Sequence, residues 1–232
     1  MEGKYFYRRR LPHLQPPGAT LFITYRLYKS IPKTVIQHLQ ETHQAALKKI
    51  EKKYQKKDGI ELMDLPPDER AFRRAAYDKE LYEEEWRYFE CFDDFLDGNL
   101  NEPHWLKRPD IAQLVADSIH FSEGRDYTLW AFCVMSNHIH LLVTMLPDAP
   151  IVWRVLQNSK KYTAVQANKR LGLSGRFWAE ESYDHLVRDG QGDQKHEFER
   201  ILGYILNNPV KAGLVRNWDD WDWSYCHPEL LP

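Results

Sequence analysis

Two histidines one residue apart are the first side chains in this sequence with the potential for chemistry. His138 and His140 lie in the stretch VMSNHIHLLV, whose apolar and β-branched residues indicate a β-strand. Because side chains alternate along a strand, both imidazoles project from one face and Ile139 projects from the other. Such a pair can bind one divalent cation. By itself an HxH pattern favours the alternative, in which one histidine is buried in the core with its hydrogen bonds satisfied and the other is exposed.

A phenol and an amide follow on an expected helix. Tyr204 and Asn208 lie in ILGYILNNPVKAGLV, four residues apart, so a helix presents them on one face. An amide oxygen suits Mg²⁺ or Mn²⁺, and a phenol can attack phosphorus when cationic groups stabilise its oxyanion. Taken singly, Asn208 is also typical of a helix end, and Tyr204 of packing between a helix and a sheet. Tyr162 and Tyr183 are the competing nucleophiles.

The elements that must position these side chains indicate an α+β fold. With residues 31–108 set aside as a mostly helical excursion, the order is strand, helix, strand, strand, helix, strand, helix. That order suggests a ferredoxin-like (RRM-like) antiparallel sheet with helices on one face. The last helix is expected to stop at Pro209, because proline disfavours helical geometry in the residue before it. Residues 1–18 look irregular.

The composition is that of an ordinary globular protein of 232 residues, with 43% hydrophobic and 28% charged side chains. We find no apolar run near the roughly 18 residues that a membrane span needs, and no secretory signal. Three widely spaced cysteines argue against a disulfide framework and a cysteine-rich zinc site. We therefore expect a cytoplasmic protein.

The net charge of −2 hides a segregated pattern. Residues 1–60 carry 13 basic and 4 acidic side chains, residues 61–100 carry 5 and 13, and residues 151–216 carry 11 and 7. A protein with this layout can present a positive face to phosphates in spite of its small net charge.

Several long stretches, in this order, resemble the single-tyrosine HUH transposases of the IS200-like superfamily. They are MSNHIHLLV, GRFWAEESYDHLVRD and YILNNPVKAGLV. The opening YRRRLPHLQPPGATLFITYRL and the block ECFDDFLDGNLNEPHWL resemble the REP-associated tyrosine transposases within that superfamily. The resemblance covers nearly the whole chain. It implies one HUH transposase domain over residues 1–232, with a mostly helical insertion at about 31–108 and a Trp-rich C-terminal tail.

The resemblance also implies a mechanism. In this family two histidines bind a divalent cation, Mg²⁺ or Mn²⁺, and they match His138 and His140. The nucleophilic tyrosine matches Tyr204, and a polar ligand one helical turn later matches Asn208. The expected enzyme cleaves and rejoins single-stranded or hairpin (REP-like) DNA through a 5′-phosphotyrosine intermediate. The alternative is a catalytically inactive, transposase-derived protein that binds DNA or RNA.

Basic side chains in two regions are expected to contact the DNA backbone. They are Arg8, Arg9, Arg10, Lys160, Lys161, Lys169, Arg176 and Lys211. Phe177 and Trp178 are candidates for stacking on an unpaired base, with core packing as the alternative. We expect a single-stranded or hairpin DNA partner, no membrane partner, a monomer in preference to a homodimer, and a bacterial, nucleoid-associated location.

Overall fold

The computed structural model describes the backbone of residues 6–8, 12–14, 16–57, 60–61, 65–98, 103–188 and 196–231. Contacts between residues divide the chain into two compact units. One unit is Met1–Ser30 together with Glu102–Pro232, and the other is Ile31–Asn101. No helix in these described ranges combines the length and the apolar character that crossing a membrane requires.

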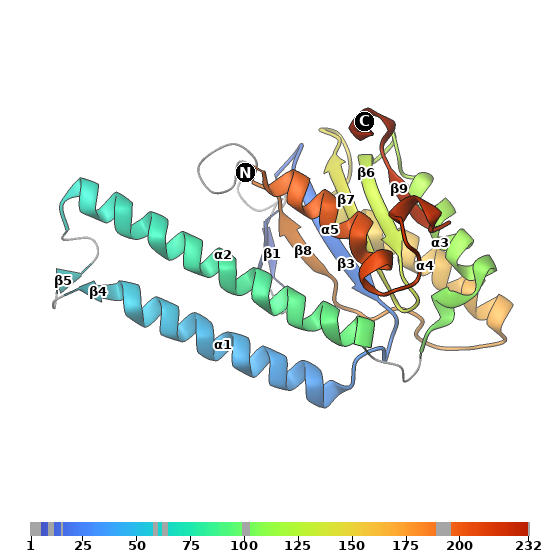
Figure 1. Cartoon of the computed structure of the whole chain (residues 1–232), viewed down its shortest axis with the longest axis horizontal. Helices are drawn as coiled ribbons and strands as arrows, with labels where there is room; N and C mark the ends of the chain where they lie inside the picture. Colours follow the sequence, from blue (N-terminus) through green and yellow to red (C-terminus); the bar gives the residue numbers. More distant parts are fainter. Residues whose placement is uncertain are drawn as a thin grey trace. The chain divides into compact units, whose positions relative to one another are not determined.

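The larger unit is built around a five-stranded sheet in the order β8-β3-β7-β6-β9, in which every neighbouring pair is antiparallel (Figure 1). Its strands are β3 (Thr20–Arg26), β6 (Tyr127–Val134), β7 (His138–Met145), β8 (Tyr183–Leu186) and β9 (Ser224–Cys226). The predicted α+β class with an antiparallel sheet is therefore confirmed.

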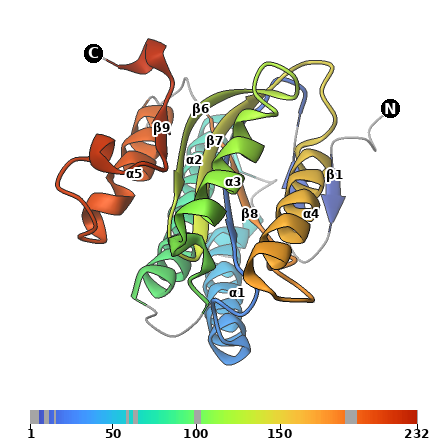
Figure 2. The same ribbon diagram turned by 90° about the vertical axis from the view of Figure 1, so that its right-hand side faces the viewer.

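Helices cover both faces of this sheet. The two helices α3 (Pro109–His120) and α4 (Val152–Leu171) lie on one face, as the ferredoxin-like plan requires. The last helix, α5 (Glu197–Lys211), lies on the opposite face, which the expected plan did not include (Figure 2). Short 3-10 turns complete the unit at Trp105–Lys107, Trp218–Asp220 and Pro228–Leu230.

Alternation along β7 separates the core from the site. Ile139, Leu141 and Val143 are fully buried in the hydrophobic core that the sheet forms with α3 and α4. The intervening His138 and His140 therefore project from the other face, toward the layer that contains α5. This alternation is the one predicted from the sequence.

A tight hairpin sets the position of His138 as the first residue of β7. The backbone N–H of Met135 donates to the His138 carbonyl at 2.9 Å, so the three residues that join β6 to β7 form a tight turn with Ser136 and Asn137 at its tip. The Asn137 carbonyl in turn accepts from the N–H of Leu27, at 2.8 Å, beside the end of β3. The turn is thereby attached to the neighbouring strand as well as to its own hairpin.

The helix α5 does not stop at Pro209 as predicted, but continues to Lys211. A proline in the last turn removes only one donor, and its own carbonyl still accepts from the N–H of Leu214 at 2.9 Å. Gly213, with φ of 69°, adopts the left-handed conformation, and its N–H donates to the Val210 carbonyl at 2.9 Å. These two hydrogen bonds form a Schellman-type ending, so the glycine ends the helix.

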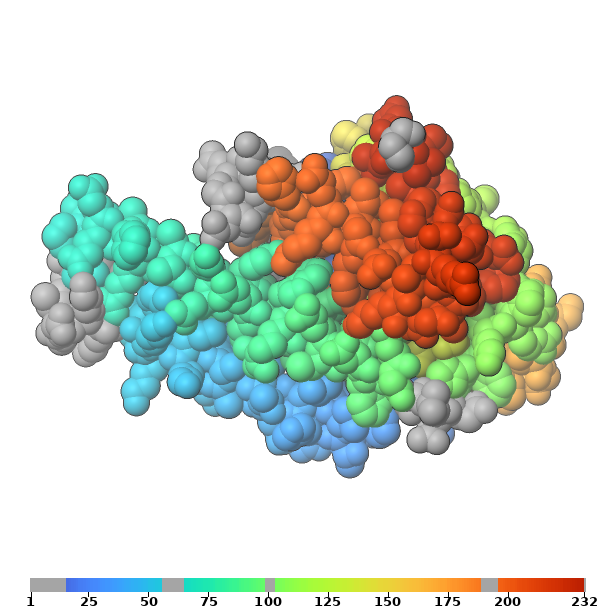
Figure 3. All heavy atoms as spheres, in the orientation of Figure 1, coloured from blue at the N-terminus to red at the C-terminus, as the bar shows by residue number. Residues whose placement is uncertain are grey.

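The segment after α5 lies beside it on the face that Figure 3 presents. Strand β9 pairs with β6, and Trp221 Nε1 donates to the Val134 carbonyl at 3.1 Å. The rings of Trp221 and Trp223 pack edge to face, with centroids 5.3 Å apart. The Trp-rich segment is thus part of the sheet unit.

The N-terminal stretch expected to be irregular contains a short antiparallel pair. Strands β1 (Phe6–Arg8) and β2 (Pro12–Leu14) pair with each other, with Tyr7 opposite His13. Three-residue strands give too little alternation to be recognised in the sequence, which is why the prediction was wrong here.

The smaller unit is an antiparallel pair of long helices, α1 (Lys33–Gln55) and α2 (Pro67–Gly98), joined through β4 (Lys56–Lys57) and β5 (Ile60–Glu61). The buried Glu84 of α2 links the two helices, because its carboxylate lies 2.9 Å from Nδ1 of His43 on α1. Within α2 the same carboxylate lies 2.7 Å from the Arg87 guanidinium. The His43 ring stacks on Tyr88 at 4.2 Å between centroids.

Candidate active site

The two histidines of β7 form the centre of the candidate site. Both side chains are buried, and their Nε2 atoms lie 3.0 Å apart. An octahedral cation that binds two ligand atoms at about 2.1 Å holds adjacent ligands about 3.0 Å apart. The observed separation of the two nitrogen atoms therefore fits a shared divalent cation.

The outer nitrogen of each imidazole has an oxygen partner. Nδ1 of His138 lies 2.7 Å from Oδ1 of Asn137, and Nδ1 of His140 lies 2.8 Å from Oγ1 of Thr24. An amide oxygen can only accept, so it places the proton of His138 on Nδ1 and directs the Nε2 lone pair inward. The Thr24 hydroxyl can accept from His140 in the same way. Metal-binding histidines depend on partners of this kind.

Asn208 reaches the same place from α5. Its side chain is buried, and Nδ2 lies 3.1 Å from Nε2 of His140. A half-turn of the amide exchanges its nitrogen and oxygen, so the carbonyl end can take the position nearest the imidazole. Two imidazoles and one amide oxygen are a donor set suited to a divalent metal ion. The residues present therefore fit such an ion.

Tyr204 lies one helical turn before Asn208 and packs against the histidine pair. Its ring meets that of His140 edge to face, with centroids 5.5 Å apart, and meets Phe22 in the same way at 6.1 Å. Phe22 also stacks on His140 at 5.8 Å. The Tyr204 side chain is only partly buried. The phenol thus lies at the edge of the histidine cluster, between buried rings and the surface.

The two competing tyrosines lie in different places. Tyr162 is on α4, on the opposite face of the sheet, and is 55% exposed. Tyr183 is on β8, opposite Thr24 in the strand register, and its ring lies 6.1 Å from Phe22. The structure therefore brings Tyr204 and Tyr183 to the side of the sheet that holds the histidines, and leaves Tyr162 on the other side.

A buried hydrogen bond between a histidine and a glutamate, which sequence reasoning missed, anchors the start of α5. Nε2 of His185 on β8 lies 2.8 Å from a carboxylate oxygen of Glu197, in the first turn of the helix. The other oxygen of Glu197 accepts from the backbone N–H of Arg188. His185 is opposite Phe22 in the register, on the face that holds the site. The helix that presents Tyr204 is therefore fixed to the edge strand.

No sequence signal links these two residues, because a histidine in a short strand and a glutamate in the first turn of a helix are both common. Thr24 and Asn137 were missed for different reasons. The contact made by Thr24 depends on strand register, whereas Asn137 is a turn residue directly before His138 and its sequence position was a usable signal.

The basic residues predicted to contact DNA fall into three groups. Lys160, Lys161 and Arg176 line a cleft of about 640 Å³ between α4 and the segment 175–184. Lys169 is exposed near the end of α4, and Lys211 is exposed in the last turn of α5, on the side of the candidate site. Arg9, Arg10 and the side chain of Arg8 lie outside the described residues.

The cleft residues do not reach the histidine pair, because α4 covers the opposite face of the sheet. Lys160 is engaged by the protein itself: its ammonium group donates to Oγ of Ser182 at 2.7 Å and lies 5.2 Å from the centre of the Tyr25 ring. Phe177 and Trp178 are buried in the core, and this favours the packing interpretation over base stacking.

Comparisons with known proteins find sequence similarity to transposases. Residues 106–208, which include both histidines, Tyr204 and Asn208, match the family model described as "Transposase IS200 like". The predicted resemblance is therefore confirmed.

Two curated relatives match part of the chain. The Haemophilus influenzae protein named "Putative REP-associated tyrosine transposase" is 28% identical over 110 residues, covering 43% of this chain and 59% of that protein. The Escherichia coli "REP-associated tyrosine transposase" is 28% identical over 115 residues, covering 48% of this chain and 62% of that protein. The chain thus matches about three fifths of the length of each relative.

A solved structure of a REP-associated tyrosine transposase bound to a REP hairpin is also similar. It is 17% identical, with a TM-score of 0.44, over 97% of this chain and 87% of that one.

Proposed function

We propose that this chain, which is similar to IS200-like and REP-associated tyrosine transposases, cleaves and rejoins single-stranded or hairpin DNA through a covalent bond to Tyr204. One observation carries the proposal: the phenol of Tyr204 packs against His140, whose Nε2 lies 3.0 Å from that of His138 and 3.1 Å from the amide of Asn208. A nucleophile and a set of metal-binding donors therefore share one face of the sheet.

His138, His140 and Asn208 are the residues proposed to hold a divalent cation, Mg²⁺ or Mn²⁺. When bound, such a cation polarises a phosphodiester and neutralises charge on its oxygens. Asn137 and Thr24 would keep the two imidazoles in the tautomer that directs Nε2 toward the cation. The buried hydrophobic face of β7, anchored in the core, keeps the two rings in register with each other.

In the proposed reaction the Tyr204 oxygen attacks phosphorus. The new bond joins that oxygen to phosphorus, and the bond between phosphorus and the 3′ oxygen breaks. The phenol gives its proton to solvent, and the departing 3′ oxygen takes one up. The product is a 5′-phosphotyrosine link and a free 3′-hydroxyl. The attack of a 3′-hydroxyl on that link restores the phenol, so one phosphate ester replaces another and no ATP is needed.

The proposed substrate is a hairpin or single strand of the REP type, a class of DNA that the names of the relatives also carry. Lys211, Lys161, Lys169 and Arg176 are proposed to contact its phosphates, whereas the ammonium group of Lys160 is held by Ser182. The protein is proposed to act as a monomer in preference to a homodimer.

An adduct assay tests the proposal. Labelled hairpin oligonucleotides incubated with the protein and Mn²⁺ are expected to give an SDS-stable, covalently labelled band. Tyr204→Phe is expected to abolish the band, whereas Tyr162→Phe, on the opposite face, serves as the matched control and keeps it. A band that persists in Tyr204→Phe but disappears in Tyr183→Phe reassigns the nucleophile. DNA or RNA binding without any band favours the inactive binding protein.

A further inference from the structure

Arg26 ends the strand next to the histidines. In the register of β3 with β7 it lies directly opposite His138, two residues along from the pair formed by Thr24 and His140. Directly opposed residues in antiparallel strands project from the same face, with Cβ atoms about 4.5–5.5 Å apart. The guanidinium of Arg26 therefore starts beside the donor set, on the same face of the sheet.

The hydrogen bonds that hold Arg26 are long and involve no charged partner. Its side chain is partly buried and donates hydrogen bonds to the Leu27 carbonyl at 3.4 Å and to Oγ of Ser30 at 3.3 Å. Both acceptors are neutral and both contacts are long. Among the residues that the structure describes, no carboxylate forms an ion pair with Arg26.

Some arginines in the same unit pair with carboxylates. Arg125, for example, lies 2.6 Å from the carboxylate of Asp126. Burial lowers the pKa of Arg26 to about 10, so its guanidinium still carries a full positive charge at neutral pH. Burying a cation without a counter-ion is costly, and the cost is offset when an anion binds there. The location thus favours an anionic ligand that is present only during function.

We propose that Arg26 binds a non-bridging oxygen of the phosphodiester that Tyr204 attacks. This inference rests on the proposed function and adds a cationic side chain at the attacked phosphate. The planar guanidinium offers several N–H donors to phosphate oxygens, and charge builds on those oxygens as phosphoryl transfer proceeds. Arg26 and the histidine pair then contact the phosphate from two adjacent strands, and Tyr204 approaches from the helix that covers them.

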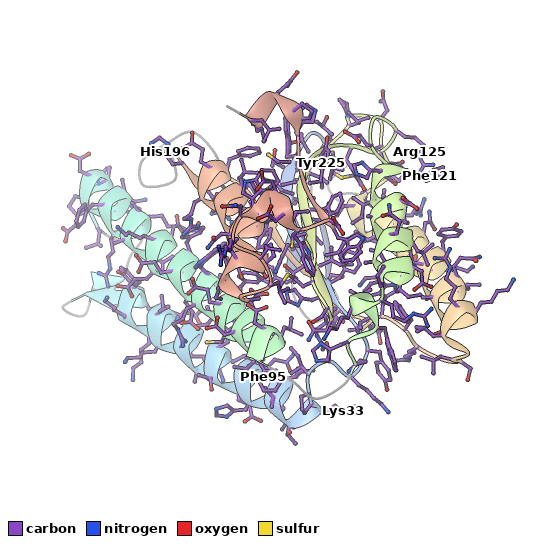
Figure 4. The ribbon with its side chains drawn as sticks, turned by 45° about the vertical axis from the view of Figure 1, so that its right-hand side comes forward. Lys33, Phe95, Phe121, Arg125, His196 and Tyr225 are labelled. Carbon is purple, nitrogen blue, oxygen red and sulfur yellow. The ribbon has the colours of Figure 1, made fainter. Side chains whose placement is uncertain are left out.

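Salt-dependent binding tests Arg26 without any chemistry. The dissociation constant for a single-stranded oligonucleotide is measured from 50 to 300 mM salt in EDTA. Losing one phosphate contact is expected to reduce the slope of log K against log salt by about 0.7 in Arg26→Gln. The matched control is Arg125→Gln, which removes the same charge at the end of α3, where that side chain lies 4.1 Å over the Phe121 ring (Figure 4). An Arg26→Gln slope equal to that of wild type overturns the inference.

The adduct assay supplies the second measurement. Arg26→Gln is expected to slow adduct formation at least a hundredfold, and Arg26→Lys, which keeps the charge but not the planar fork, is expected to lose less. A methylphosphonate at the cleaved position removes the negative oxygen, so on that substrate the wild type and Arg26→Gln are expected to react at similar rates. An Arg26→Gln penalty that is as large on methylphosphonate as on phosphate contradicts a contact to that oxygen.

The two proposals fail in different ways. If Tyr204→Phe keeps the covalent band while Arg26→Gln reduces the slope of log K against log salt, Tyr204 is not the nucleophile and the phosphate contact of Arg26 stands. If Tyr204→Phe abolishes the band and Arg26→Gln changes neither slope nor rate, only the role of Arg26 is wrong. Thermal melting of each variant identifies a misfolded protein. If Arg26→Gln is misfolded, the charge-conserving Arg26→Lys tests the inference instead, because it is expected to keep the wild-type salt slope.

Discussion

Nε2 of His138 and Nε2 of His140 lie 3.0 Å apart on adjacent outward positions of one strand. Because each Nδ1 faces an oxygen, the two Nε2 lone pairs point toward each other across this distance, and a cation that both lone pairs bind would remove their repulsion. The proposed cation is therefore expected to stabilise the fold.

The first prediction follows from that linkage. At a Mn²⁺ concentration a hundred times its Kd, binding adds about 2.7 kcal/mol, which for a chain of this size raises Tm by about 5–10 °C. His140→Ala is expected to lose this rise. The control is His120→Ala, because His120 lies on α3, on the opposite face, and pairs with Glu123. Differential scanning calorimetry with and without Mn²⁺ makes the measurement, and an equal rise in wild type and His140→Ala would contradict it.

The second prediction concerns the partner of His140. Thr24→Val keeps the shape of the side chain and removes the hydroxyl that lies 2.8 Å from Nδ1. Loss of such a partner is expected to weaken Mn²⁺ binding by about 10–100-fold. Thr20→Val is the matched control, because Thr20 lies on the same strand and face as Thr24. It removes a hydroxyl that lies 2.7 Å from Oγ1 of Thr144 on β7. Calorimetric titration of Mn²⁺ into each variant distinguishes them, and equal affinities would show that Thr24 does not support the ligand.

Periodicity predicted the local parts of the site. Alternation along a strand put His138 and His140 on one face, and a spacing of four put Tyr204 and Asn208 on one side of a helix. Neither rule says which face of the sheet the helix covers. The order β8-β3-β7-β6-β9 and the position of α5 decide that His140 meets Tyr204, and both are tertiary facts.

The errors have local causes. The prediction that α5 stops at Pro209 gave the proline too much weight and overlooked Gly213, four residues later, which supports a helix ending without steric cost. The DNA contact expected of Lys160 stays a prediction, and its hydrogen bond to Ser182 depends on a loop position that no sequence pattern indicates. The role proposed for Arg26 was not predicted from the sequence, because it depends on the strand register that places Arg26 opposite His138.

The third prediction tests the anchor of α5. Glu197→Ala leaves His185 and the N–H of Arg188 without their buried acceptor, at an expected cost of about 2–4 kcal/mol in the free energy of unfolding. Glu199→Ala, two residues away, breaks only the exposed pair with His196 and is expected to cost less than about 0.5 kcal/mol. Urea unfolding followed by circular dichroism measures both.

Glu197→Ala also distinguishes the positioning of Tyr204 from the binding of the metal ion. Because Glu197 touches neither histidine of β7 in the described contacts, Glu197→Ala is expected to keep Mn²⁺ affinity while forming the DNA adduct more slowly. A loss of Mn²⁺ affinity equal to the loss of rate would instead mean that the whole face of the sheet has become disordered.

The fourth prediction separates two adjacent lysines of α4. Lys160 donates to Ser182 at 2.7 Å and to the Ala179 carbonyl at 3.3 Å, so Lys160→Met is expected to cost about 1–2 kcal/mol in the free energy of unfolding. Lys161 is exposed, and Lys161→Met is expected to change stability by less than about 0.5 kcal/mol. Urea unfolding decides between them, and equal costs would contradict a structural role for Lys160.

Lys160 and Lys161 are also expected to differ in DNA binding. A lysine whose ammonium group is already held by the protein has little to gain from a phosphate, whereas an exposed one can release a counter-ion when DNA binds. Lys161→Met is therefore expected to lower the salt slope of single-strand binding by about 0.7, and Lys160→Met to leave it nearly unchanged. If the slope falls equally in both variants, the Lys160 ammonium leaves Ser182 when DNA binds and the cleft of α4 contacts the strand as a unit.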